Sequence, residues 1–139
     1  MANYCLDSNV VSDILRKQPE VMKHLDSVLD DNNLFISSIV YYEIVRGLKA
    51  AGKTRKLEEF KNFYANVKHL FLDKDDLTAV KKASDIYVQL HNGQLIEDND
   101  IYIAAISMVN GCTLVTANTR HFSRVEGLDF VNWRDDVSG

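Results

Sequence analysis

Short apolar runs alternate along the chain with longer stretches in which hydrophobic residues return every three or four positions. The short runs predict strands at residues 3–6, 34–36, 69–72, 113–115 and, more weakly, 128–131. The longer stretches predict six amphipathic helices. The first, third and last are expected to be capped by residue 8 or 9, by residue 37 or 38, and by residue 98 or 99, and the others to begin at Pro19, near residue 55, and at residue 75 or 76. Residues 30–33 form a polar turn cluster. Strands separated by helices predict an α/β fold, with a parallel sheet of four to five strands and helices on both of its faces.

The overall composition fits one domain and excludes several classes of protein. The 139 residues include one proline and six glycines and show no repeat or linker, so we expect a single domain over residues 1–139. The net charge is −4, so any nucleic-acid-binding surface must be local. No apolar run approaches the ~20 residues of a membrane span, and the first residues lack a signal-peptide pattern, so we expect a cytoplasmic protein. Cys5 and Cys112 stand in apolar segments and are expected to be buried thiols.

Polar residues that follow predicted strands are the first places to look for chemistry, because ligands of open parallel sheets bind beyond the C-terminal ends of the strands. Residues 37–43 and 116–118 follow two such strands, and Asp7 directly follows the first one. An aspartate at that position can cap the next helix or contribute to a binding site. Both interpretations of Asp7 remain open from the residue alone.

The helix predicted from residue 37 or 38 carries an acid where a hydrophobic residue is expected. Glu43 lies four residues after Ile39 and three after Val40, so it sits on or beside the apolar stripe of that helix. Burial of an ionised carboxylate without a partner costs several kcal/mol, so we expect something to compensate its charge. Arg46, one turn further along, and a bound metal ion are equally consistent with this pattern.

Asp100 repeats the anomaly in the helix predicted from residue 98 or 99. It lies three residues before Ile103 and four before Ala104, both expected to be buried. An acid in the first turn can complement the helix dipole, worth ~0.3–1 kcal/mol, but this explains an exposed acid rather than an inward-facing one. Asp98 and Asn99 are better placed to cap the helix.

Three acids from distant segments, each near the C-terminal end of a predicted strand, can therefore meet at one spot. Like charges share a dry site only when protons or cations neutralise them. A set of carboxylates without histidine or cysteine suits a hard divalent cation, above all Mg²⁺ or Mn²⁺. Such a site is suited to metal-assisted hydrolysis of a phosphodiester.

Four segments resemble, in order and spacing, the successive motifs of PIN-domain ribonucleases. They are Leu6-Asp-Ser-Asn9, Ser37-Ser-Ile-Val-Tyr-Tyr-Glu-Ile-Val-Arg-Gly47, Asn99-Asp-Ile-Tyr-Ile-Ala-Ala105 and Val115-Thr-Ala-Asn-Thr-Arg-His-Phe122. The likeness covers essentially the whole chain and is greatest to the VapC toxins of bacterial toxin–antitoxin modules. The segment Gly127-Leu-Asp-Phe-Val-Asn-Trp133 also resembles the C-terminal tail of those toxins. It implies a PIN-like α/β/α sandwich, an endoribonuclease that depends on Mg²⁺ or Mn²⁺, and inhibition by a cognate VapB-like antitoxin.

The resemblance also implies roles for individual residues. Asp7, Glu43 and Asp100 correspond to the family's acidic cluster, with Asp7 and Asp100 as direct metal ligands and Glu43 as a ligand or as the residue that positions a water. The fourth acidic position of the family falls on Asn118, which offers an amide oxygen without a charge. Asp98 either substitutes for that missing acid or caps its helix.

Further polar residues are expected around the acids. The residues that flank the cluster and are expected to orient it are Ser8, Asn9 and Thr116. An RNA substrate also needs local positive charge, because phosphate contacts supply much of the affinity. The candidates for RNA contact are Arg46, Arg120 and His121. The basic residues from 49 to 56 either extend that surface or form an ordinary solvated face.

Partners and competing functions remain open from the sequence. The helical segments 44–51 and 57–63 are a candidate groove for an amphipathic helix of the antitoxin, or part of the core. The resemblance implies a homodimer or a toxin–antitoxin hetero-oligomer that does not associate with membranes. One alternative is a catalytically degenerate PIN module that binds RNA or protein, suggested by Asn118. Another is a Mg²⁺-dependent phosphatase with Asp7 as nucleophile, although Asn9 occupies the place of its usual second acid.

Overall fold

The computed structural model of the protein describes residues 2–29, 33–73 and 76–135. In chain order its elements are β1 (Asn3–Leu6), α1 (Ser8–Leu15), α2 (Pro19–Val28), β2 (Asn33–Ser37), α3 (Ser38–Ala50), α4 (Thr54–Ala65), β3 (Lys68–Leu70), α5 (Thr78–Leu90), α6 (Asp98–Val109), β4 (Thr113–Val115), α7 (Thr119–Phe122) and β5 (Phe130–Val131). Residues 30–32 of the expected turn, and Asp75 as an expected helix start, lie outside the described residues.

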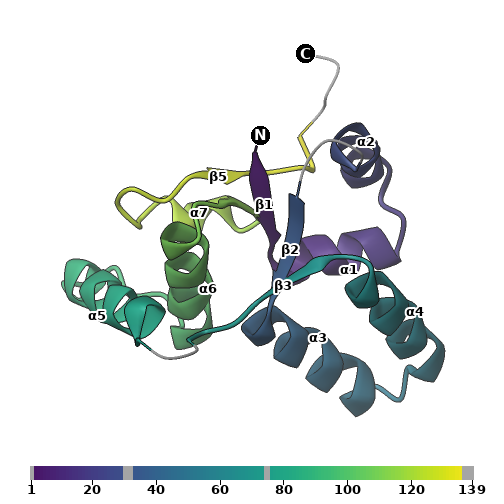
Figure 1. The fold of residues 1–139 in the computed structure, drawn as a ribbon, viewed down its shortest axis with the longest axis horizontal. Coiled ribbons are helices and arrows are strands. Elements are labelled where there is room, and N and C mark those ends of the chain that lie inside the picture. Colours follow the sequence, from purple (N-terminus) through teal and green to yellow (C-terminus); the bar gives the residue numbers. More distant parts are fainter. Residues whose placement is uncertain (1, 30–32, 74–75, 136–139) are drawn as a thin grey trace.

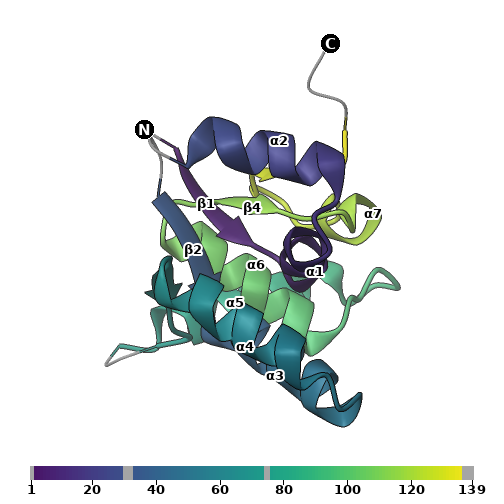
Figure 2. The same ribbon diagram turned by 90° about the vertical axis from the view of Figure 1, so that its right-hand side faces the viewer.

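The strands form one parallel sheet in the order β3-β2-β1-β4-β5, as the alternation of strands and helices predicted. In Figure 1, α5 and α6 lie on one side of this sheet and α1 to α4 lie on the other. In Figure 2, α2 runs across the view and α1 is seen nearly end-on. Fully buried residues from the three central strands, Leu6, Ile36 and Leu114, join these layers into one core. The α/β sandwich expected from the sequence is therefore confirmed.

Most element boundaries follow the local sequence signals. Pro19 opens α2 and the Gln18 side chain accepts a hydrogen bond from the Val21 amide at 2.8 Å, which caps the helix. Ser37 caps α3 by accepting from the Val40 amide at 3.2 Å. Gly111 adopts a φ of 65°, a left-handed conformation that suits glycine, and turns the chain from α6 into β4.

Two helix starts differ from the expectation. Helix α5 begins at Thr78 rather than at residue 75 or 76, because the Asp73 carboxylate accepts hydrogen bonds from the amides of Ala79 and Val80 at 3.0 and 3.2 Å. Helix α6 begins at Asp98, and the extended Glu97 stands in the capping position. The expectation that Asp98 caps this helix was therefore wrong, because its backbone is already helical.

Other local features were shorter than expected or were not anticipated. Strand β3 ends at Leu70, and Phe71 after it is 51% exposed. Helix α7 is a single turn that starts directly after Asn118 and was not predicted. No helix within the described ranges is long and apolar enough to cross a membrane. Cys5 and Cys112 are both buried and unpaired, as expected from their apolar surroundings.

An ion pair with a buried carboxylate ties the C-terminal segment to α1. Asp13 is fully buried, and the partly exposed Arg134 donates two hydrogen bonds to it, from Nε at 2.6 Å and from a terminal nitrogen at 3.0 Å. Arg16, on the same helix, donates to the same carboxylate. Next to Arg134, Trp133 is 2% exposed and packs edge-on against Tyr4 at 5.6 Å between ring centres. The C-terminal segment thus supports the helix that follows Asp7.

Candidate functional site

Asp7 lies at the C-terminal end of the central strand β1, between β2 and β4. Its amide donates to the carbonyl of Val115 at 2.9 Å, so the residue still pairs with the neighbouring strand, and only 3% of its surface is exposed. Its Oδ1 accepts from the Ser8 amide at 2.8 Å, which makes it the cap of α1. Its Oδ2 accepts from Thr116 Oγ1 at 2.8 Å and from Asn9 Nδ2 at 3.1 Å. Asp7 therefore has the capping role considered above and is also held in one orientation.

Hydrogen bonds tie the segment after β4 to the residues around Asp7. Thr116 has no exposed surface, and besides donating to Asp7 its hydroxyl oxygen accepts from the Asn118 amide at 3.0 Å. Asn9 Oδ1 accepts from the Ala117 amide at 2.9 Å. The loops after β1 and β4 are therefore joined into one rigid edge, although Asp7 and Thr116 are 109 residues apart in sequence.

Glu43 comes from α3, on the other side of this edge. Its Oε2 accepts from Asn99 Nδ2 at 3.5 Å, which links α3 to the first turn of α6. Its Oε1 is buried and has no hydrogen-bond partner among the described residues. Arg46 does not form an ion pair with it: the guanidinium donates instead to the hydroxyl of Tyr42 at 3.3 Å. Arg46 therefore offsets the charge of Glu43 only weakly and without a direct contact.

The three acids make the ionised form of their carboxyl groups less favourable, through burial and through mutual repulsion. Burial raises the pKa of Asp7, and its three hydrogen bonds oppose that effect. Burial and the charge of Asp7 raise the pKa of Glu43, with smaller opposing contributions from Asn99, Ser8 and Arg46. Burial, followed by the charges of Asp7, Glu43 and Glu97, raises the pKa of Asp100 from 3.8 to about 7. Carboxyl groups from β1, α3 and α6 thus repel one another across a partly dry space.

The remaining predicted site residues divide into those near this cluster and those away from it. The Asn118 side chain points to α7, where its Nδ2 donates to His121 Nδ1 at 2.9 Å. Arg120, the neighbour of His121, is exposed. Asp98 is exposed and lines a groove between α5 and α6 with Val80 and Tyr87. The backbone amide of Asn118 is therefore held near Asp7 by its hydrogen bond to Thr116, whereas Asp98 lies on the side of α6 that faces α5.

The residues of the cluster suit a divalent cation in their chemistry, although they do not enclose one. No group of three His, Cys, Asp or Glu side chains in residues 2–29, 33–73 and 76–135 is arranged to hold a metal ion. The acids nevertheless offer only oxygen atoms, their mutual repulsion calls for a positive charge, and Glu43 Oε1 lacks a partner. Mg²⁺ commonly uses one or two protein carboxylates and completes its shell with water and phosphate oxygens. The donor set fits that pattern of binding.

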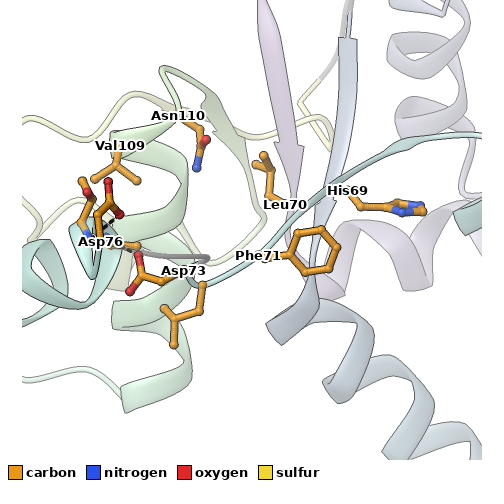
Figure 3. A pocket seen from close by; sticks show the side chains of 10 residues that line it. His69, Leu70, Phe71, Asp73, Asp76, Val109 and Asn110 are labelled. Carbon is orange, nitrogen blue, oxygen red and sulfur yellow. Dashed lines mark hydrogen bonds between the residues drawn. The ribbon is translucent and has the colours of Figure 1, made fainter.

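Two other hollows lie away from the acids. Figure 3 shows the one beside β3, of about 460 Å³, whose lining includes Leu70 and Phe71 and, at the C-terminal end of α6, Val109 and Asn110. Asp73 in this hollow already caps α5. The other, of about 470 Å³, is an apolar groove between α1, α2 and α4. Its lining includes Ile14, Met22, Leu25, Leu29, Phe63 and Val67.

The sequence did not reveal every residue that shapes the site. Asn99 was interpreted as a helix cap, whereas its amide contacts Glu43. The side chain of Glu97 was not considered, although its charge contributes to the raised pKa of Asp100. Both effects depend on how α3 packs against α6, for which the spacing within either helix gives no signal.

Comparison with known proteins identifies the family. The sequence model of the PIN domain matches residues 4–128, and the chain therefore belongs to the PIN domain family. It is similar to ribonuclease VapC2 of Rickettsia felis, with 28% identity over 94% of this chain and 97% of the relative. It is also similar to a VapC ribonuclease, Y4jK, of Sinorhizobium fredii, with 31% identity over 91% of this chain and 94% of the relative. These relatives place it among the VapC ribonucleases, as the motif resemblance predicted.

Solved structures share the fold of this chain. The VapBC2 complex of Rickettsia felis, bound to a DNA fragment from its promoter, contains a chain that matches with a TM-score of 0.85 at 24% identity, over 94% of this chain and 98% of that one. The DNA-bound VapBC complex of Salmonella typhimurium matches with a TM-score of 0.82 at 25% identity, over 96% and 99% of the two chains. The fold described above is therefore the PIN fold over nearly its full length.

Proposed function

We propose that this protein is an endoribonuclease that depends on a divalent metal ion and acts as the toxin of a toxin–antitoxin pair. The observations that support the proposal are the charge interactions that link Asp7, Glu43 and Asp100, the raised pKa of each, and the one oxygen of Glu43 that lacks a partner among the described residues. The names of its relatives, which are VapC ribonucleases, support the same activity.

In this proposal Asp7 and Asp100 hold Mg²⁺, or Mn²⁺, and Glu43 binds it or orients the attacking water. When bound, the cation offsets the charge of the phosphodiester and lowers the pKa of water. The chain itself supplies orientation: Ser8, Asn9 and Thr116 fix the carboxylate of Asp7 by hydrogen bonds. Asn118 is the proposed fourth site residue, as an uncharged oxygen ligand or a partner for water.

Basic side chains at the rim are proposed to hold the RNA. Arg46 lies on the α3 side of the cluster, where the charges of Glu43 and Glu97 act on it. Arg120 and His121 lie on the α7 side, directly after the Thr116–Asn118 segment. Cations on both sides of the acids would place a phosphate of the backbone between them.

The proposed protein partner is a VapB-like antitoxin, since the Salmonella typhimurium structure similar to this chain is a VapBC complex. The groove between α1, α2 and α4 is the surface we propose for it, because its volume of about 470 Å³ and apolar lining suit the hydrophobic face of a helix. The segments 44–51 and 57–63 enclose a smaller hollow of about 170 Å³, lined by Leu48 and Leu57. A homodimer or a toxin–antitoxin hetero-oligomer remains the proposed assembly.

Cleavage of RNA by the purified protein, with Mg²⁺ or with a chelator, tests the proposal. We expect cleavage that requires Mg²⁺ and is abolished in Asp100→Asn. The matched control is Asp85→Asn, the same substitution at an exposed position of α5, and it should cleave as the wild type does. RNA binding without metal-dependent cleavage would instead support the degenerate module. A phosphoryl group trapped on Asp7 would support the phosphatase.

A further inference from the structure

An exposed tyrosine stands beside the acid cluster and has no structural role in the core. Tyr42 is 55% exposed, although it immediately precedes Glu43 on α3. A single exposed ring is common on protein surfaces, so exposure alone does not indicate a ligand. What sets Tyr42 apart is its contact with Arg46, whose charge interacts with Glu43 of the acid cluster.

Arg46 stabilises one orientation of this ring. Its guanidinium carbon lies 4.9 Å from the centre of the Tyr42 ring, and one of its nitrogens donates to the Tyr42 hydroxyl at 3.3 Å. The two planar groups are one helical turn apart, so α3 itself sets their spacing. A guanidinium over an aromatic face is attracted to it by the ring quadrupole. The pair is thus a partly preorganised flat surface with a positive charge.

Further cations continue along the same face of the helix. Lys49 follows Arg46 by three residues and is exposed, and Lys53 lies just beyond the end of α3 and is also exposed. Proteins that bind single-stranded nucleic acid combine aromatic rings, on which bases stack, with positive groups that follow the backbone. Tyr42, Arg46 and Lys49, spaced by four and three residues, provide both on one face of α3, and Lys53 adds a positive charge beyond the turn that ends the helix.

We propose that Tyr42, together with Arg46, is a stacking platform for an unpaired RNA base next to the phosphate to be cleaved. This inference rests on the proposed ribonuclease function and adds a positioning residue to it. A base must leave the helical stack to reach the platform, so the contact favours single-stranded or looped RNA over a duplex. The positive charge around the ring favours a nucleic acid over the apolar face of a protein helix.

Binding of short fluorescein-labelled RNAs, measured by fluorescence anisotropy, tests the platform. All proteins carry Asp100→Asn, so that the RNA is not cleaved, and the probes are single-stranded polyadenylate and the same strand paired with polyuridylate. We expect Tyr42→Ala to weaken binding of the single strand roughly 5- to 150-fold, the range for one stacked base. Binding of the duplex should not change. Tyr42→Phe keeps the ring and should retain most of the affinity.

A control and a salt titration separate stacking from other effects. Tyr87→Ala removes another exposed tyrosine, 49% exposed on α5, and should not alter binding. Tyr42→Ala should leave the salt dependence of the affinity unchanged, whereas Arg46→Gln should reduce its slope by about 1. Equal losses on single strand and duplex, no loss in Tyr42→Ala, or no binding by the parent protein would each overturn the platform.

An unchanged RNA affinity together with an altered sedimentation coefficient in Tyr42→Ala would assign the ring to a protein contact and also overturn the proposal. These outcomes are distinct from a failure of the ribonuclease function. That function is tested by metal-dependent cleavage and its loss in Asp100→Asn, neither of which involves Tyr42. Normal cleavage by Tyr42→Ala with normal RNA affinity would reject the platform alone.

Discussion

Replacement of Asp100 by asparagine is expected to stabilise the metal-free protein above neutral pH while it removes the proposed activity. In the folded protein, burial and the charges of Asp7, Glu43 and Glu97 raise the pKa of Asp100 from 3.8 to about 7. At face value this rise corresponds to about 4 kcal/mol. Because the side chain is only about half buried, solvent screening reduces the expected effect to about 1–2 kcal/mol. Asparagine keeps the shape of the side chain and never ionises.

The sign of the pH dependence follows from proton linkage. The folded protein binds the proton of Asp100 more tightly than the unfolded chain does, so its stability from this group is fully present below the unfolded pKa of 3.8. That stability is lost as the pH rises, and the loss is complete above the folded pKa of about 7. The Asp100→Asn variant lacks this loss, so its advantage over the wild type should grow between these two values and then remain constant.

Urea denaturation of both proteins, in the presence of a chelator, measures this difference. We expect similar midpoints near pH 4 and a higher midpoint for Asp100→Asn at about pH 8. Addition of Mg²⁺ at about pH 8 should stabilise the wild type, because a ligand that binds only the folded state raises its stability, and should have little effect on the variant. A wild type that is more stable than the variant at the higher pH without metal would refute the repulsion inferred for this cluster.

Three further substitutions test other contacts. Arg134→Ala removes two charge-assisted hydrogen bonds from the buried Asp13 and should lower the free energy of unfolding by about 1–3 kcal/mol in urea titrations; an unchanged midpoint would contradict it. Thr116→Val removes the hydroxyl that donates to Asp7 and should reduce RNA cleavage about 10–100-fold, whereas Thr116→Ser should preserve it; equal rates for both variants would exclude a role of Thr116 in orienting Asp7. Asn118→Asp adds a carboxylate and should tighten Mn²⁺ binding in calorimetry; weaker binding would argue against residue 118 as a ligand.

Features that depend on neighbouring residues were predicted well. Apolar spacing located the strands and helices, and the signals at Pro19 and Ser37 marked the starts of α2 and α3. Features that depend on contacts across a loop were predicted poorly. The Asp73 carboxylate caps α5 from six and seven residues before the amides it accepts from, so the local pattern favoured a helix start that was too early.

The candidate site shows the same division. Asp7, Glu43 and Asp100 were recognisable because each is an acid in apolar surroundings. The contact between Asn99 and Glu43 depends on the packing of α3 against α6, and no periodicity reports it. Asp13 was overlooked as a buried charge because its partner Arg134 is 121 residues away.

The order of strands in the sheet has a consequence for protein synthesis. Strand β1 is made before the other strands of the sheet but occupies its middle, and its neighbour β4 is made only after β2 and β3. A nascent chain that has not yet emerged from the ribosome as far as Thr116 lacks the hydroxyl that orients Asp7, and one that ends before α6 lacks Asp100 altogether. A translation product that ends before Thr116 therefore cannot assemble this site, so RNA cleavage by the nascent chain would begin only after Thr116 has been made and has folded against Asp7.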